Sequence, residues 1–62
     1  MYTIEQFFDL FANSLNKRIL IFIDGGFVSL TKARFVKLRS CSFVYLGQEW
    51  MINKKENKVA KL

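Results

Sequence analysis

Residues 18–30, RILIFIDGGFVSL, decide the fold class because two apolar runs flank a tight-turn signal. Every residue from 19 to 23 is β-branched or bulky, and the run is too short for a separate helix. It therefore predicts a buried central strand that is apolar on both faces. Asp24-Gly25-Gly26 supplies the positive φ angles of a tight turn, and residues 27–30 resume as the returning strand. We expect a β-hairpin at about residues 18–30.

An amphipathic helix is expected before this hairpin. The apolar residues that recur at the spacing of one helical face are Ile4, Phe7, Phe8, Phe11 and Leu15. Thr3 and Gln6 have the spacing of a capping box, and Tyr2 can pack on Phe7 as a hydrophobic staple. Asn16 suits the left-handed conformation that closes a helix. These signals predict a helix at about residues 3–15.

A second hairpin is expected at about residues 42–53. Apolar runs at 43–46 and 50–52 flank Gly47-Gln48, which fits a two-residue loop with glycine first. The tail from residue 53, NKKENKVAKL, has few side chains to bury. We expect its polar part to be mobile or to become ordered on binding.

Residues 31–39, TKARFVKLR, are compatible with a strand or with a short helix capped by Thr31. A strand with a bulge at Phe35-Val36 would place the four cations of this segment on one face, whereas a helix would scatter them around its axis. We prefer the bulged strand. The fold class expected is therefore α+β, with one N-terminal helix packed on a small bent antiparallel sheet of four to five strands.

The composition bounds the ways in which so small a core is stabilised. The chain has 62 residues, 52% of them hydrophobic, with one cysteine and no histidine. It has room for a single domain, residues 1–62, and cannot form an intrachain disulfide or a cysteine–histidine zinc site. Cores of this size commonly need a partner. We expect a homo-oligomer, with no cofactor and no metal.

Several features bear on location and origin. The longest apolar run, residues 19–23, is far shorter than the ~20 residues of a membrane span. The unpaired Cys41 and the absence of a basic N-terminal region favour the cytoplasm. Phenylalanine, isoleucine, lysine, asparagine and tyrosine make up 25 of the 62 residues. These residues have A/T-rich codons, which are typical of phages and mobile elements of low-GC bacteria.

The residues that could support catalysis are few. Without histidine, a general base would have to be a carboxylate or a lysine with a lowered pKa. Glu5 and Asp9 share a helical face, but acids in this position are typical partners of the helix dipole. Cys41 follows Arg39, which could lower its pKa, yet no base accompanies the thiol. We expect no enzymatic activity.

The net charge of +5 indicates anionic partners. The candidate binding residues are Lys32, Arg34, Lys37, Arg39, Tyr45 and Trp50. Cations contact phosphates or acidic protein faces, and aromatic rings stack on bases or anchor protein interfaces. The function expected is a small non-enzymatic interaction protein, an accessory factor of a phage or mobile element, that binds a macromolecular partner. The alternatives are a protein that binds RNA or single-stranded DNA through the same residues, and a binder of small anionic nucleotides. In a further alternative, Tyr45 and Trp50 are core residues.

Overall fold

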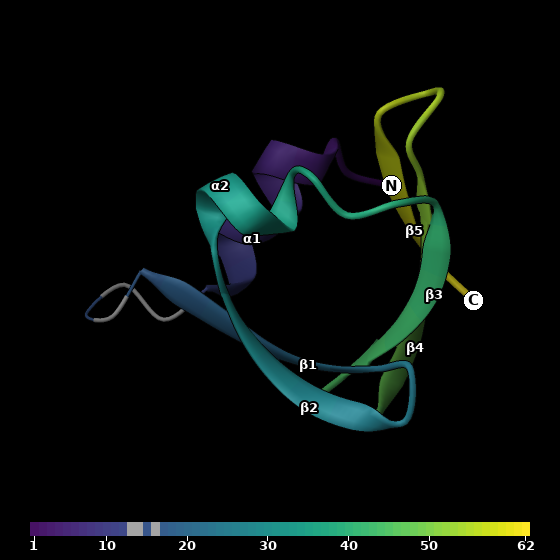
Figure 1. Ribbon diagram of the computed structural model, residues 1–62. Helices are drawn as coiled ribbons and strands as arrows, with labels where there is room; N and C mark the ends of the chain where they lie inside the picture. The colour runs from purple at the N-terminus through teal and green to yellow at the C-terminus, as the bar shows by residue number, and fades with distance from the viewer. Residues whose placement is uncertain (13–14, 16) are drawn as a thin grey trace.

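The structure is a computed structural model that describes residues 1–12, 15 and 17–62. These residues form a five-stranded antiparallel sheet, an N-terminal helix and a second, short helix, so the expected α+β fold class is confirmed (Figure 1). In chain order the elements are α1 (Ile4–Phe11), β1 (Arg18–Ile23), β2 (Gly26–Thr31), α2 (Lys32–Phe35), β3 (Cys41–Tyr45), β4 (Gln48–Asn53) and β5 (Lys58–Lys61).

Helix α1 begins as its sequence signals predict. The Thr3 hydroxyl accepts a hydrogen bond from the Gln6 amide, and the Gln6 side chain accepts one from the Thr3 amide, both at 3.1 Å. The rings of Tyr2 and Phe7 meet edge to face, as the staple requires. The helix ends at Phe11, however, because the backbone is already extended at its C-cap, Ala12.

The expected end of this helix at residue 15 is therefore wrong. Leu15 is 91% exposed and does not continue the buried stripe. Asn16, the expected C-cap, lies outside the described residues.

Both hairpins close through two-residue turns with positive φ at both turn positions. In the first turn, Asp24 and Gly25 have φ angles of 53° and 81°. In the second, Leu46 and Gly47 have φ angles of 48° and 77°. This is the pattern of a type I′ turn, which matches the twist of the flanking strands. The expected loop at Gly47-Gln48 is therefore wrong by one residue, since such a turn places its glycine second.

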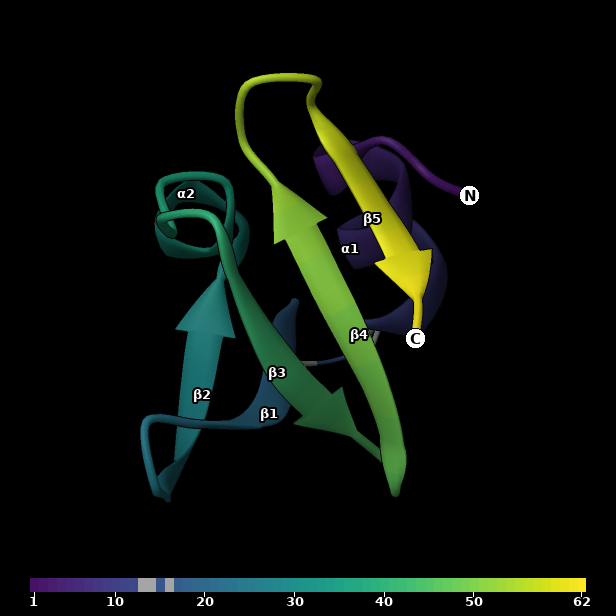
Figure 2. The same cartoon turned by 90° about the vertical axis from the view of Figure 1, so that its right-hand side faces the viewer.

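The strand order is β2-β1-β3-β4-β5, and every neighbouring pair is antiparallel. A pair between Phe22 and Val44 joins the two hairpins. The sheet curves around α1, and the two helices close its open side (Figures 1 and 2).

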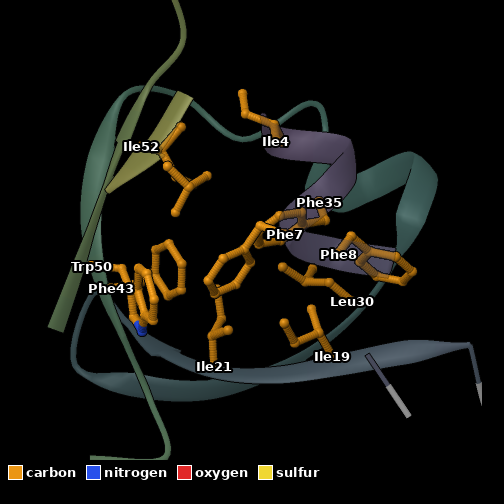
Figure 3. Close-up of a cluster of buried hydrophobic side chains, with 11 residues drawn as sticks. Ile4, Phe7, Phe8, Ile19, Ile21, Leu30, Phe35, Phe43, Trp50 and Ile52 are labelled. Atoms are coloured by element: carbon orange, nitrogen blue, oxygen red, sulfur yellow. The ribbon is translucent and has the colours of Figure 1, made fainter. Parts of the chain in front are cut away.

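The core fills the concave side of the sheet (Figure 3). Its buried residues are Ile4, Phe7, Phe8, Ile19, Ile21, Leu30, Phe35, Phe43, Trp50, Ile52 and Val59. Strand β1 contributes Ile19 and Ile21 to this core, whereas Leu20 and Phe22 point to the outer side. Strand β1 is thus apolar on both faces, as expected, but one of these faces is exposed.

Residues 31–39 do not form the expected bulged strand. Strand β2 ends at Thr31, and α2 follows at once, with the Val36 amide bonded to the Lys32 carbonyl at 3.0 Å. This helical turn brings Phe35 into the core, where it is 0% exposed and stacks on Phe7. Burial of this ring explains why the helical alternative is the one adopted.

The C-terminal tail contributes the fifth strand of the sheet. Strand β5 pairs with β4, and Val59 is 0% exposed. The main chains of Val59 and Tyr2 also exchange hydrogen bonds of 3.0 and 2.7 Å. Pairing with β4 and burial of Val59 thus hold in place a segment whose composition is mostly polar. In the described part of the chain, no helix is both long and apolar enough to cross a membrane.

Candidate interaction surface

The two aromatic residues of the expected binding set lie in or against the core. Trp50 is 8% exposed, and its ring centroid lies 4.8 Å from that of Phe7 and 5.8 Å from that of Phe11. Tyr45 is half-buried and donates a hydrogen bond of 2.7 Å from its hydroxyl to the Phe11 carbonyl. This placement agrees with the alternative in which both are core residues. Neither ring lies with the cations on one surface.

Two of the four expected cations form exposed ion pairs. Lys32 Nζ lies 2.9 Å from Asp9 Oδ1, so it links α2 to α1. Arg39 contacts both carboxylate oxygens of Asp24, at 2.6 and 2.8 Å. The hydrogen bond to Asp24 and its negative charge raise the pKa of Arg39. Both side chains therefore have partners within the chain, although both ion pairs are exposed.

The other two cations, Arg34 and Lys37, lie on α2 and the loop that follows it. This segment adjoins the turn between β4 and β5. The Lys54 amide donates to Ser40 Oγ at 2.8 Å, and Lys54 Nζ donates to the Val36 carbonyl. We call the four cations of these two segments other than the ion-paired Lys32 and Arg39 the basic rim. They are Arg34, Lys37, Lys54 and Lys55. Lys54 and Lys55 are absent from the candidate set because the sequence analysis assigned them to the polar tail.

Cys41 lies at the start of β3 as a free, partly buried thiol. Burial raises its pKa, the Asp24 carboxylate raises it further, and the Arg39 guanidinium opposes both effects. The expected lowering by Arg39 is thus outweighed, and the thiol remains protonated at neutral pH. A protonated thiol is a poor nucleophile.

The convex side of the sheet carries an apolar surface. Cross-strand partners share a face, so Phe27, Phe22 and Val44 form one row across β2, β1 and β3. The Phe22 and Phe27 rings meet edge to face with centroids 5.1 Å apart. On the same side, Met51 of β4 lies opposite Ala60 of β5.

We call this surface the outer apolar face. Its residues are Leu20, Phe22, Phe27, Val44, Met51 and Ala60. Phe27 is 75% exposed, Leu20 57%, Met51 39% and Phe22 37%. Polar residues on the same side of the sheet are Arg18 and Ser29 on β1 and β2, and Ser42 and Glu49, which lie directly opposite Met51 and Val44. The signal in the sequence was present, since residues 19–23 are apolar at both alternating positions.

An apolar patch with a polar border on a protein of this size is typical of an interaction surface. The described residues contain no group of three or more histidine, cysteine, aspartate or glutamate side chains that could hold a metal ion. Comparison of the chain with protein-family models, curated proteins and solved structures gave no match.

Proposed function

We propose that this protein is a non-enzymatic interaction protein that binds a partner protein through the outer apolar face. The observation that carries the proposal is the exposed row of Phe27 and Phe22, continued by Leu20 on the same strand as Phe22. The position of Trp50 in the core and of Tyr45 against it shifts the proposed binding surface away from the basic and aromatic set expected from the sequence.

The exposed fractions indicate how much a partner would gain here. Complete burial of a large apolar side chain contributes about 1.5–3 kcal/mol. Scaled by the exposed fractions of Leu20, Phe22 and Phe27, a partner that covers these three gains about 3–5 kcal/mol. This contribution is comparable to that of a hot-spot cluster in a protein interface.

A charge placed on this face tests the proposal. Leu20→Asp introduces a carboxylate on this face next to Phe22, and Leu10→Asp introduces the same charge on α1, where Leu10 is 64% exposed. Wild type, Leu10→Asp and Leu20→Asp are immobilised and exposed to lysate of the source cell at low and high salt. We expect wild type and Leu10→Asp to retain the same partner at both salt concentrations and Leu20→Asp to lose it. Equal capture by all three proteins contradicts the proposal.

The basic rim supports a second candidate function, the binding of RNA or single-stranded DNA. Contacts between Lys54 and the segment 36–40 bring its four cations to one end of the molecule. If phosphates are the ligand, log affinity falls linearly with log salt in a fluorescence-anisotropy titration. Lys37→Gln and Lys55→Gln should then each reduce the slope by about one unit. Absence of binding at low salt excludes this candidate for the nucleic acids tested.

The role of an accessory factor in a phage or mobile element belongs to the same proposal. Its support is the high content of residues with A/T-rich codons. The genes on both sides of this one test it. Conserved housekeeping genes in both positions contradict a mobile origin and leave the interaction surface unaffected.

A further inference from the structure

We propose that the free edge of the sheet at β2 pairs with β2 of a second copy of this chain. The two strands run antiparallel across a twofold axis, so the two five-stranded sheets become continuous. This inference concerns the edge of the sheet, goes beyond the proposed function and does not depend on it.

Strand β2 lacks the features that prevent edge pairing in other proteins. Edge strands are usually protected by charged side chains, proline, bulges or short length. Strand β2, GFVSLT, has six residues, no charge and no proline, and it pairs with β1 without a bulge. Phe27, Val28 and Ser29 are all exposed. The strand is therefore open to pairing along most of its length.

The register of the hairpin defines which main-chain groups are available. Ile23 and Gly26 flank a two-residue turn and form a hydrogen-bonded pair, and such pairs alternate along antiparallel strands. Val28 and Leu30 consequently direct their main-chain groups toward β1. Phe27 and Ser29 direct theirs outward, toward a partner strand.

Arg18 is the one side chain that reaches a main-chain group of this edge among the described contacts. Its guanidinium donates to the Ser29 carbonyl at 3.2 Å and to the Ser29 hydroxyl at 3.1 Å. A carbonyl oxygen has two lone pairs, so it can also accept a bond from a partner strand. The amide of Ser29 and both main-chain groups of Phe27 are unaffected by Arg18.

The opposite edge of the sheet is protected, which selects a second copy of β2 as the partner. Strand β5 carries Lys58 and Lys61, and its outer side is bridged by the main chain of Tyr2 at Val59. Pairing of β2 with β5 of another copy would generate a ring or an open filament. Protection of β5 blocks that arrangement, whereas pairing of β2 with β2 closes as a dimer.

The distribution of charge is compatible with antiparallel self-pairing. Asp24 precedes β2 at the turn, and Lys32 follows β2 at the start of α2. An antiparallel partner places the Asp24 end of one strand beside the Lys32 end of the other, and each of these charges has an ion-pair partner within its own chain. Between these ends lies an uncharged strand, so the net charge of +5 on each copy is located away from the contact. In the continuous sheet, the exposed Phe27 side chains of the two copies lie on one side, and their exposed Val28 side chains lie on the other.

Sedimentation equilibrium and amide hydrogen exchange test this arrangement in the wild-type protein. We expect a monomer–dimer equilibrium that tightens as salt rises, because salt screens the repulsion between two positive copies. As the dimer forms, the amides of Phe27 and Ser29 should become protected, whereas those of Val28 and Leu30 are already protected by β1. A monomer at all concentrations overturns the proposal, and so does a dimer in which Phe27 and Ser29 continue to exchange rapidly.

Two variants with the same added charge give an independent test. Phe27→Lys places a cation on the edge strand, and Leu20→Lys places one on the same face but on the interior strand β1. We expect Phe27→Lys to weaken dimerisation at least tenfold and Leu20→Lys to leave it within about twofold of wild type. An equal loss in both variants indicates stacking of two outer faces and overturns edge pairing. Circular dichroism confirms that each variant is folded.

These results are distinguishable from failure of the proposed function. If the outer apolar face binds a partner protein, Leu20→Asp abolishes capture of that partner, whatever the oligomeric state. Protection of the Phe27 and Ser29 amides reports edge pairing in the purified protein, whatever else the face binds.

Discussion

Trp50→Ala separates a core role of this residue from a surface role. Trp50 is 8% exposed and packs on Tyr2, Phe7 and Phe11. Truncation of a buried tryptophan to alanine destabilises a protein by about 3–5 kcal/mol. At about 0.05–0.15 kcal/mol per residue, a domain of this length has a total stability of about 3–9 kcal/mol. We therefore expect the variant to lose at least about a third of its free energy of unfolding.

Trp50→Phe gives a graded version of the same test. The indole Nε1 is buried and has no hydrogen-bond partner among the described residues, a condition that costs about 1–3 kcal/mol. Phenylalanine removes this donor, but the void of about 40 Å³ that it leaves costs about 1 kcal/mol, at ~24 cal/mol per Å³. Lost apolar area adds a similar cost. These effects oppose one another, so we expect a free energy of unfolding within about 1 kcal/mol of wild type.

Urea denaturation followed by far-ultraviolet circular dichroism measures both variants. In wild type, the single tryptophan also reports its own burial through protection of its fluorescence from iodide quenching. Two results together refute the buried position of Trp50. The free energy of unfolding of Trp50→Ala lies within 1 kcal/mol of wild type, and iodide quenches the indole fluorescence of the wild-type protein. Equal destabilisation by Trp50→Phe and Trp50→Ala shows instead that the indole donor has a partner.

Three further predictions address local features of the fold. Tyr45→Phe removes the hydrogen bond to the Phe11 carbonyl and should lower the free energy of unfolding by about 1–2 kcal/mol; no change in urea denaturation contradicts this role. Burial raises the pKa of Cys41, so its alkylation rate should reach half-maximum at a higher pH in the folded protein than in urea. The contribution of this thiol to the free energy of unfolding is complete at pH values below about 8.5, the pKa of cysteine in an unfolded chain. It is lost as the pH rises through the higher pKa of the folded protein. A folded midpoint at or below the unfolded one contradicts the prediction. Gly47→Ala places a side chain at φ 77° and should destabilise by about 1–2 kcal/mol, whereas Gly26→Ala, at an ordinary φ with open space, should be neutral or slightly stabilising. Equal thermal shifts in the two variants contradict the assignment of the turn.

The first helix and the two hairpins were predictable because their signals are local. The reciprocal bonds of Thr3 and Gln6 involve residues three apart, and the turn at Asp24-Gly25 depends on its own φ angles. Such interactions form with little dependence on distant parts of the chain. The error at the second turn was also local, because glycine was assigned to the first turn position and occupies the second, as Gly47.

The segments that sequence reasoning assigned wrongly depend on distant contacts. Residues 32–35 are helical because Phe35 enters the core beside Phe7, 28 positions earlier in the chain. The tail is ordered because Val59 pairs with β4 and with Tyr2 at the other end of the chain. Propensity within either segment does not contain this information.

In the candidate site, too, the residue types were evident from the sequence, whereas their placement depends on distant contacts. Residue types alone identified cations and aromatic rings, but they did not show that Trp50 points into the core or that Asp24 binds Arg39. Exposure of Phe22 and Phe27 depends on which side of the curved sheet α1 covers.

By itself, the sequence determined the fold class, the start of the first helix and the existence of both hairpins, through capping, periodicity and turn residues. The tertiary structure alone decided the second helix, the fifth strand and which apolar side chains remain exposed. The physical reason is that burial and strand pairing join residues far apart in the chain. Their free energy is therefore a property of the assembled core, not of any one segment.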